Sequence, residues 1–163
     1  MLDRMMRAGL LLALLCNQAQ GGEVSTEYAD RQAIGEQLAE YAYRWDRKDA
    51  EAFTELFAED GVIDWVLGGE PAERNVVGRP TILAYARNAH AERIGDRQSR
   101  HHFTSLVFRE LSADRAVTEN MMLVTHQPPG GEIEVMSSGY YRIVWTKTDG
   151  EWLIAQRTLY VDR

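Results

Sequence analysis

The sequence has a single cysteine and no long block of basic residues. Because Cys16 is the only cysteine in 163 residues, a disulfide framework and a cysteine-based metal site or nucleophile are excluded. Lys and Arg number 18 against 25 Asp and Glu, which gives a formal charge of -7. A surface that follows a phosphate backbone needs clustered positive charge, so nucleic acid is not expected as a partner. The hydrophobic share of 45% is that of an ordinary globular domain with a packed core.

Long apolar runs are also absent. The apolar segment Leu10–Leu15 follows Arg4 and Arg7 and precedes the small-residue pattern Ala19-Gln20-Gly21. This order is typical of a secretory signal peptide, although an N-terminal extension has the same features, and both interpretations of residues 1–22 stay open. The segment is too short to cross a bilayer, so no stable membrane insertion is expected.

The expected location of the protein depends on which interpretation of residues 1–22 holds, whereas the number of domains does not. If residues 1–21 are a cleaved signal peptide, the protein is periplasmic or secreted, and otherwise it is cytoplasmic. The remaining residues 23–163 have the length of one ordinary domain and carry no internal repeat.

Helical patterns dominate the first half of this domain. A helix is predicted from about Ser25, because apolar residues recur at spacings of four, three and four at Ile34, Leu38, Tyr41 and Trp45. A second helix is predicted from about Asp49, which can cap it, to Phe57. A third starts at Pro80 and runs to about Arg93.

The rest of the chain reads as β-strands, which makes the fold class α+β. A strand is predicted over Val62–Leu67, and four longer runs are predicted near Arg100–Glu110, Arg115–His126, Glu132–Lys147 and Glu151–Val161. The short turns between the four runs predict an antiparallel meander. Both faces of these strands are apolar, so one face is expected to pack on the helices. A homodimer or homotrimer interface is expected on the other, with Phe103, Val107, Met122, Val124, Tyr140 and Val144.

Three polar residues are candidates for chemistry. Asp46 lies at the border of the apolar face of the first helix, where it could act as a base or merely cap the next helix. His101 and His102 are successive strand residues, so one of them points inward, and the alternation with Leu106 and Phe108 favours His102. A hydrogen-bonded core histidine is the alternative interpretation.

His126 is predicted to lie directly opposite His102. This pairing follows if the hairpin between their strands turns at Asp114. Two histidines and a carboxylate could bind a divalent cation, but no ligand spacing supports a metal site and none is predicted. Neither a nucleophile elbow nor a phosphate-binding loop is present in the sequence, so acid–base chemistry is what remains.

Three strings of the sequence resemble one known family. RWDRKDAEAFTELFAEDGVIDW, RHHFTSLVFRELSADRAV and GYYRIVWTKTDGEWLI resemble the SnoaL-like branch of the nuclear transport factor 2-like superfamily, over roughly residues 27 to 163. Within it the chain is similar to scytalone dehydratase, bile-acid dehydratases and hexachlorocyclohexane dehydrochlorinase. The resemblance implies a cone-shaped barrel: a curved, mostly antiparallel sheet wrapped by N-terminal helices around an apolar pocket. It also implies no metal and no organic cofactor.

The resemblance also implies roles for particular residues. Asp46 and His102 match the pair that removes a proton, and His126 matches a second histidine in a V-x-H-Q context. Tyr41 matches a helix tyrosine of the bile-acid enzymes, and Tyr141 falls near a pocket asparagine.

Two departures from the dehydratase pattern concern the pocket wall. Trp45 and Trp65 stand where scytalone dehydratase has tyrosines. An indole nitrogen only donates, so a tyrosine–water pair cannot be built in the same way and a different substrate is expected. Both indoles are nevertheless expected to line the pocket, where aromatic walls suit a flat or ring-shaped ligand.

These observations lead to two hypotheses of function. The first is a cofactor-independent lyase or isomerase that carries out elimination or double-bond migration on a small, largely apolar, cyclic substrate with an Asp46–His102 dyad. The alternative is a non-catalytic module of the same fold that binds a small ligand or assembles with another chain.

Overall fold

The computed structural model describes residues 26–73 and 75–162. The predicted signal peptide lies outside these residues. The chain divides into two compact units, Met1–Ile34 and Gly35–Arg163. In the first unit residues 26–34 are helical, and the second unit contains the sheet and the other helices. No helix in the described ranges is long and apolar enough to cross a membrane.

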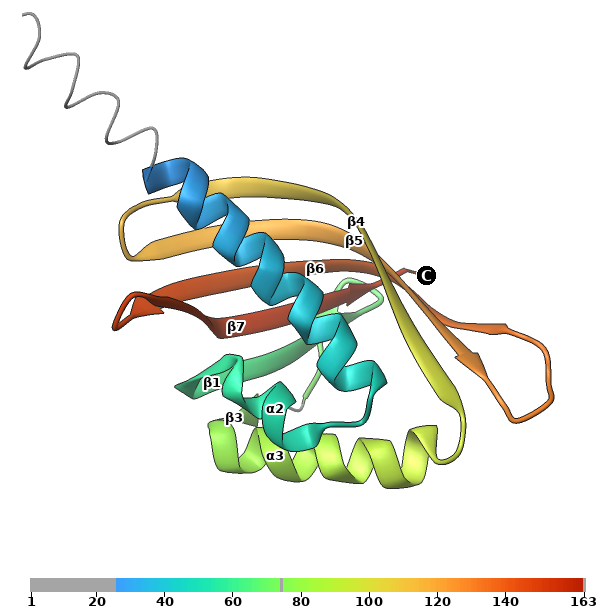
Figure 1. Cartoon of the computed structure of the whole chain (residues 1–163). Helices are drawn as coiled ribbons and strands as arrows, with labels where there is room; N and C mark the ends of the chain where they lie inside the picture. Colours follow the sequence, from blue (N-terminus) through green and yellow to red (C-terminus); the bar gives the residue numbers. More distant parts are fainter. Residues whose placement is uncertain (1–25, 74, 163) are drawn as a thin grey trace, which may run out of the picture. The chain divides into compact units, whose positions relative to one another are not determined.

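The second unit begins with a helical segment, residues 35–46, which crosses in front of the sheet (Figure 1). The predicted face of this segment is buried, with Leu38 5%, Tyr41 2% and Trp45 7% exposed. Helix α2 (Ala50–Glu55) follows, and as predicted Asp49 caps it by accepting a hydrogen bond of 2.9 Å from the backbone of Ala52. The helix ends before the predicted Phe57, because the chain there joins the sheet.

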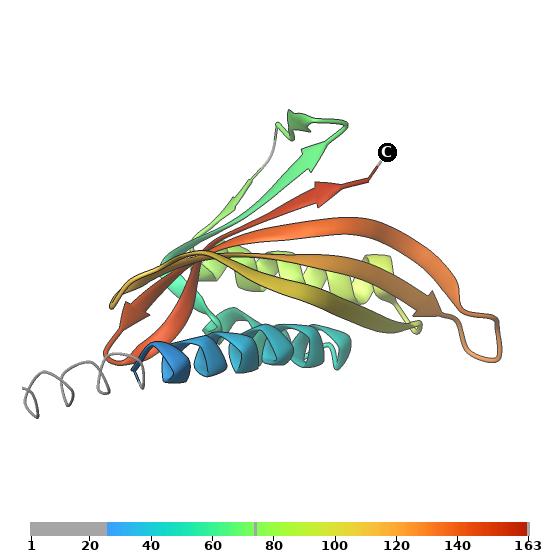
Figure 2. The same cartoon turned by 90° about the horizontal axis from the view of Figure 1, so that it is seen from above.

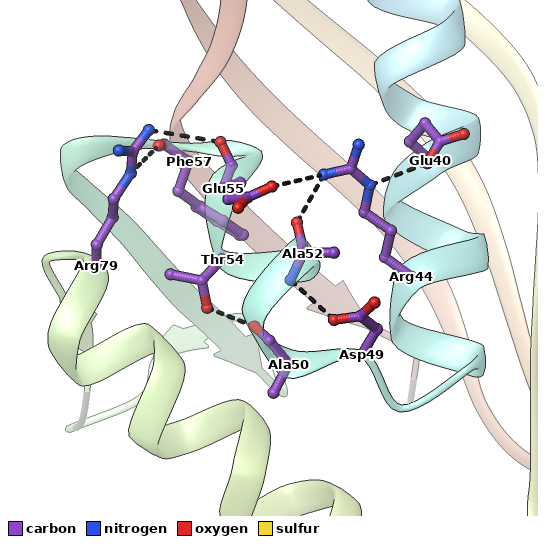
Figure 3. A network of polar contacts seen from close by, with 9 residues as sticks. All are labelled: Glu40, Arg44, Asp49, Ala50, Ala52, Thr54, Glu55, Phe57 and Arg79. Atoms are coloured by element: carbon purple, nitrogen blue, oxygen red, sulfur yellow. Dashed lines mark hydrogen bonds and ion pairs between the residues drawn. The ribbon is translucent and has the colours of Figure 1, made fainter.

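Arg44 ties the end of the first helical segment to α2 (Figure 3). Its guanidinium donates to the Glu40 carboxylate at 2.9 Å and to the Ala52 carbonyl at 2.7 Å. Helix α3 (Arg79–Asn88) is joined to the same region, because Arg79 donates to the Phe57 carbonyl at 2.8 Å. These bonds fix where the helical segment ends, which is where Asp46 lies.

The sheet contains seven strands. They are β1 (Phe57–Leu67), β2 (Glu70–Pro71), β3 (Val76–Val77), β4 (Gln98–Leu111), β5 (Arg115–Gln127), β6 (Glu134–Thr148) and β7 (Glu151–Val161). Their order is β2-β1-β7-β6-β5-β4, with β3 paired to β1. Strands β4 to β7 form the predicted antiparallel meander, and β1 adds to β7 in parallel.

The predicted α+β class is confirmed. The sheet is curved and does not close, because β4 and β2 are its two ends (Figure 2). Residues 35–46, α2 and α3 lie on one side of it. Helix α3 continues as a π-helical segment, η1 (Ala89–Ile94), so the predicted third helix extends about as far as expected.

The prediction of the outer sheet face is half wrong. Val107 and Tyr140 do lie on it, 41% and 38% exposed, as does Met121 at 61%. Phe103, Met122 and Val124, however, face the helices: the Phe103 ring lies 6.0 Å from that of Tyr41, and the other two line a cavity. A bulge in β4 is the physical reason for Phe103, because it reverses which residues of that strand point inward. Met122 and Val124 lie on β5, where alternation places them on the same inward face as His126.

The capping bond of α2 yields a first prediction. Replacing Asp49 by Ala removes the acceptor for the Ala52 N–H and should lower the free energy of unfolding by about 1 kcal/mol. Asn caps helices equally well, so Asp49→Asn should keep the stability. Denaturant unfolding of both variants measures this, and equal losses in the two would refute the capping role.

Candidate active site

A buried carboxylate and imidazole form the centre of the site. Asp46 lies at the end of the helical segment, and its Oδ1 is 2.8 Å from Nδ1 of His101 on β4. The two side chains are only 8% and 6% exposed. This contact joins two residues that are 55 positions apart in the chain.

Two further donors hold the same carboxylate. The His101 backbone N–H donates to Oδ2 at 2.7 Å, and the Ser99 hydroxyl donates to Oδ1 at 2.8 Å. Burial works to raise the pKa of Asp46, but these bonds and the interaction with the His101 ring outweigh it and lower that pKa. Asp46 therefore stays ionised near neutral pH.

The tautomer of His101 follows from the charge of Asp46. An ionised carboxylate only accepts hydrogen bonds, so Nδ1 of His101 must carry the proton. In neutral imidazole the other nitrogen, Nε2, is then unprotonated and can accept a proton. The carboxylate thus fixes the ring and leaves one basic nitrogen.

A cavity of about 330 Å³, open to solvent on one side, adjoins this pair. Helix residues supply Tyr41, Trp45 and Tyr85, the sheet supplies Trp65 and Tyr141, and His101 contributes its ring to the wall. The predicted Trp45, Trp65, Tyr41, Tyr141 and His126 all line the cavity, whereas their role in binding a substrate stays a prediction.

A buried cation lies in the same cavity. Arg157 on β7 is 3% exposed, and its guanidinium carbon lies 4.9 Å from the centre of the Tyr141 ring and 5.4 Å from that of Trp65. It hydrogen-bonds with the Tyr41 hydroxyl, which also bonds with Tyr141. Burial raises the pKa of the Tyr141 hydroxyl well above its ordinary value, so this group remains a donor.

Comparison with known families identifies the fold. The family model described as a SnoaL-like domain matches residues 26–158. The chain belongs to the SnoaL-like domain family. No curated protein matches the sequence.

Several solved structures are similar to this SnoaL-like domain. A variant of Rv3472, a protein of unknown function from Mycobacterium tuberculosis, has a TM-score of 0.74 at 30% identity, over 86% of this chain and 76% of the other. A candidate scytalone dehydratase from Novosphingobium aromaticivorans has a TM-score of 0.73 at 20% identity, over 86% and 89%. A protein from Catenulispora acidiphila in complex with S-DNPA has a TM-score of 0.70 at 25% identity, over 83% and 95%.

The SnoaL-like domain does not place His102 at the carboxylate. His102 lies on the outer face of β4, exposed, with Nε2 3.2 Å from the Thr125 hydroxyl. The prediction assumed unbroken alternation back from Leu106 and Phe108. A β-bulge between Thr104 and Val107 breaks it: Ser105, at φ 57°, and Leu106 lie together opposite a single residue of β5. The bulge turns His101 inward instead.

The predicted pairing of His102 with His126 is also wrong. Leu123 lies opposite His102, and Ser99 lies opposite His126. Two bulges each add one unpaired residue to β4, and the hairpin turns before Asp114, so the register moves by three positions. His126 still lines the cavity, because it shares the inward face with Ser99 and His101.

Sequence reasoning missed Arg157 as well. The signal for Arg157 was its place in β7, two residues before the apolar Leu159, which puts both side chains on the inward face of the strand. A charged residue in such a position is either paired or functional. Among the described residues no group of three His, Cys, Asp or Glu side chains is arranged to hold a metal ion.

The buried histidines predict how stability depends on pH. Burial and the charge of Arg97 lower the pKa of His126, and burial and Lys48 lower that of His90. The unfolded chain therefore binds these protons more readily, and stability should fall as the pH drops below about 6.5, until it passes the lowered pKa values. His126→Gln should flatten this fall in denaturant titrations between pH 7.5 and 5, and an unchanged slope would contradict the assignment.

Proposed function

We propose that the protein is a cofactor-independent lyase or isomerase in which His101 removes a proton from carbon. The observation that carries this proposal is the buried Asp46–His101 pair, whose imidazole lines an aromatic cavity that also holds a buried cation. Family membership and the fold agree with the proposal, although the same fold also serves binding proteins.

The proposed step uses the groups in the cavity wall. Nε2 of His101 takes a proton from a carbon next to an electron-withdrawing group, and Asp46 stabilises the imidazolium that forms. In an elimination the electron pair of the broken C–H bond becomes the new double bond as the leaving group departs. In a double-bond migration no group leaves, and the electron pair delocalises into the electron-withdrawing group until another carbon is protonated. Arg157 stabilises the negative charge that develops on the substrate.

The proton on His101 then has two possible destinations. In a dehydration it passes to the departing hydroxide and forms water, and His126 can hydrogen-bond to that oxygen. In a double-bond migration the proton returns to another carbon of the substrate. Both outcomes balance without an external oxidant or reductant, so neither requires a redox cofactor.

A generic probe tests for a positioned base before the substrate is known. 5-Nitrobenzisoxazole is a flat aromatic molecule that opens to a coloured phenolate when a base removes one ring proton. The protein should open it faster than buffer does, and His101→Ala should lower the rate by about two to four orders of magnitude, the usual scale of general-base catalysis. Asp46→Asn should lower it by a similar factor, because the amide does not fix the tautomer.

His102 provides the matched control for this experiment. It is the neighbouring histidine on the opposite face of β4, so His102→Ala should leave the rate unchanged. Thermal midpoints of the variants establish that each still folds. Full activity in His101→Ala, or equal losses in the two histidine variants, would overturn the mechanism. A wild-type rate no higher than that of His101→Ala would favour the alternative, a module that only binds its ligand.

We also propose that the protein self-associates through the outer sheet face. Val107, Met121, Leu123 and Tyr140 are exposed there, and Tyr140 stacks on Tyr160 with ring centres 4.5 Å apart. A monomer would leave this apolar face in water. Light scattering at micromolar concentration should therefore report a dimer or trimer.

A matched pair of lysine variants tests the face. Met121→Lys, at a residue 61% exposed, should shift the protein to monomer, because it places charge within the apolar face. Ile133→Lys, at a residue 67% exposed in the β5–β6 turn, should not. A wild-type monomer would rule out the interface.

A further inference from the structure

The cavity of the SnoaL-like domain is lined by positive and neutral groups only. Two arginines, Arg93 and Arg157, and two histidines, His101 and His126, contribute to its wall, and no Asp or Glu does. Asp46 lies behind His101, and its charge is engaged by three donors. The chain as a whole carries a formal charge of -7, so the positive lining of this cavity is opposite in sign to the net charge of the chain.

Arg157 lacks a carboxylate partner in the part of the chain that the structure describes. Its guanidinium donates to the backbone carbonyl of Asp64 at 3.2 Å and hydrogen-bonds with the Tyr41 hydroxyl, which are both neutral groups, and its buried Nε has no partner among the described residues. Buried cations in proteins are normally paired with an anion, since removal from water is costly. An electron-rich group in the inner part of a ligand, on which negative charge can develop, would supply that missing partner.

Arg93 provides a second cation where the cavity meets solvent. The residue is exposed and yet lines the cavity, which places it at the rim. Its guanidinium donates to the Tyr85 hydroxyl at 2.8 Å and lies 5.2 Å from the centre of that ring. The Tyr85 ring is itself 5.9 Å from Trp45 and 5.6 Å from Trp65, so Arg93 is held on an aromatic support.

The remaining donors of Arg93 are available to a ligand. A guanidinium has five N–H groups, and the bond to Tyr85 uses one. No carboxylate within the described ranges forms an ion pair with it, including the neighbouring Glu92 and Asp96. The N–H groups of a guanidinium form a planar fork, and this geometry suits the two oxygens of a carboxylate.

We infer that the ligand of this cavity is a ring-bearing carboxylate, with its apolar body between the aromatic walls and its carboxylate on Arg93 at the rim. This inference specifies the substrate class for the proposed function and rests on it for the identity of the site. Arg93 is then the residue that selects charged over neutral ligands, and Arg157 faces the inner part of the same molecule.

Two fluorescent probes of similar shape test the inference without any turnover. 8-Anilinonaphthalene-1-sulfonate carries one negative charge, and N-phenyl-1-naphthylamine lacks it. The wild-type protein should bind the anionic probe more tightly, and the preference should shrink at high salt. Arg93→Gln should weaken the anionic probe about tenfold, the scale of one charge-assisted hydrogen bond, and leave the neutral probe within about twofold.

A second exposed arginine provides the matched control. For this comparison Arg97 is unsuitable, because it donates to the Arg93 carbonyl and its charge acts on His126 of the cavity wall. Arg87 on α3 is exposed and does not line the cavity, so Arg87→Gln is the control and should leave both probes unchanged. Arg93→Lys keeps the charge and should retain most of the preference for the anionic probe, even if the rim rearranges in Arg93→Gln.

Two results would overturn the inference. They are equal affinity of the wild-type protein for the two probes, and equal effects of Arg93→Gln and Arg87→Gln. Because the probes report binding alone, a failure here is distinct from a failure of the proton-transfer experiment. The opposite combination, selective binding without base catalysis, would leave the ligand class standing and remove the lyase.

Discussion

One buried carboxylate connects the helices to the sheet at the site. Asp46 receives three hydrogen bonds, from the backbone and the ring of His101 and from the hydroxyl of Ser99. An ionised group this buried is stable only when its acceptor capacity is filled, so the helix end and β4 must meet in one arrangement. Arg44 and the Asp49 cap fix the helix side of that contact, and the bulge in β4 fixes the strand side. The position of the basic nitrogen therefore depends on features that never touch a ligand.

The cavity combines aromatic, apolar walls with a few charged groups. Its aromatic rings come from the helices and from the sheet, so neither layer forms the cavity alone. Burying Arg157 among tyrosines and a tryptophan gives it ring contacts and hydroxyl partners in place of water. The same arrangement keeps a positive charge inside a protein whose overall charge is negative.

The elements of the fold were predictable from the sequence, whereas the identity of the inward histidine was not. Periodicity and turn residues locate the helices and strands, because they are local properties of the chain. The choice between His101 and His102 depends instead on Ser105, whose bulge reverses the alternation and leaves no clear trace in composition. Arg157 could have been found because it shares a strand face with the apolar Leu159. Its proximity to Tyr41 and Tyr141, however, depends on the three-dimensional fold.

The bulge also bears on why two successive histidines stand in β4, because a register shift of one residue would exchange their positions. In the observed register His101 lies opposite Val124. If β4 ran without the bulge at Ser105, the strand would slip by one residue and His102 would take that same place. An imidazole would then occupy this position on the inward face in either register. The paired histidines thus give this strand a tolerance to a shift of one residue that a single histidine would lack.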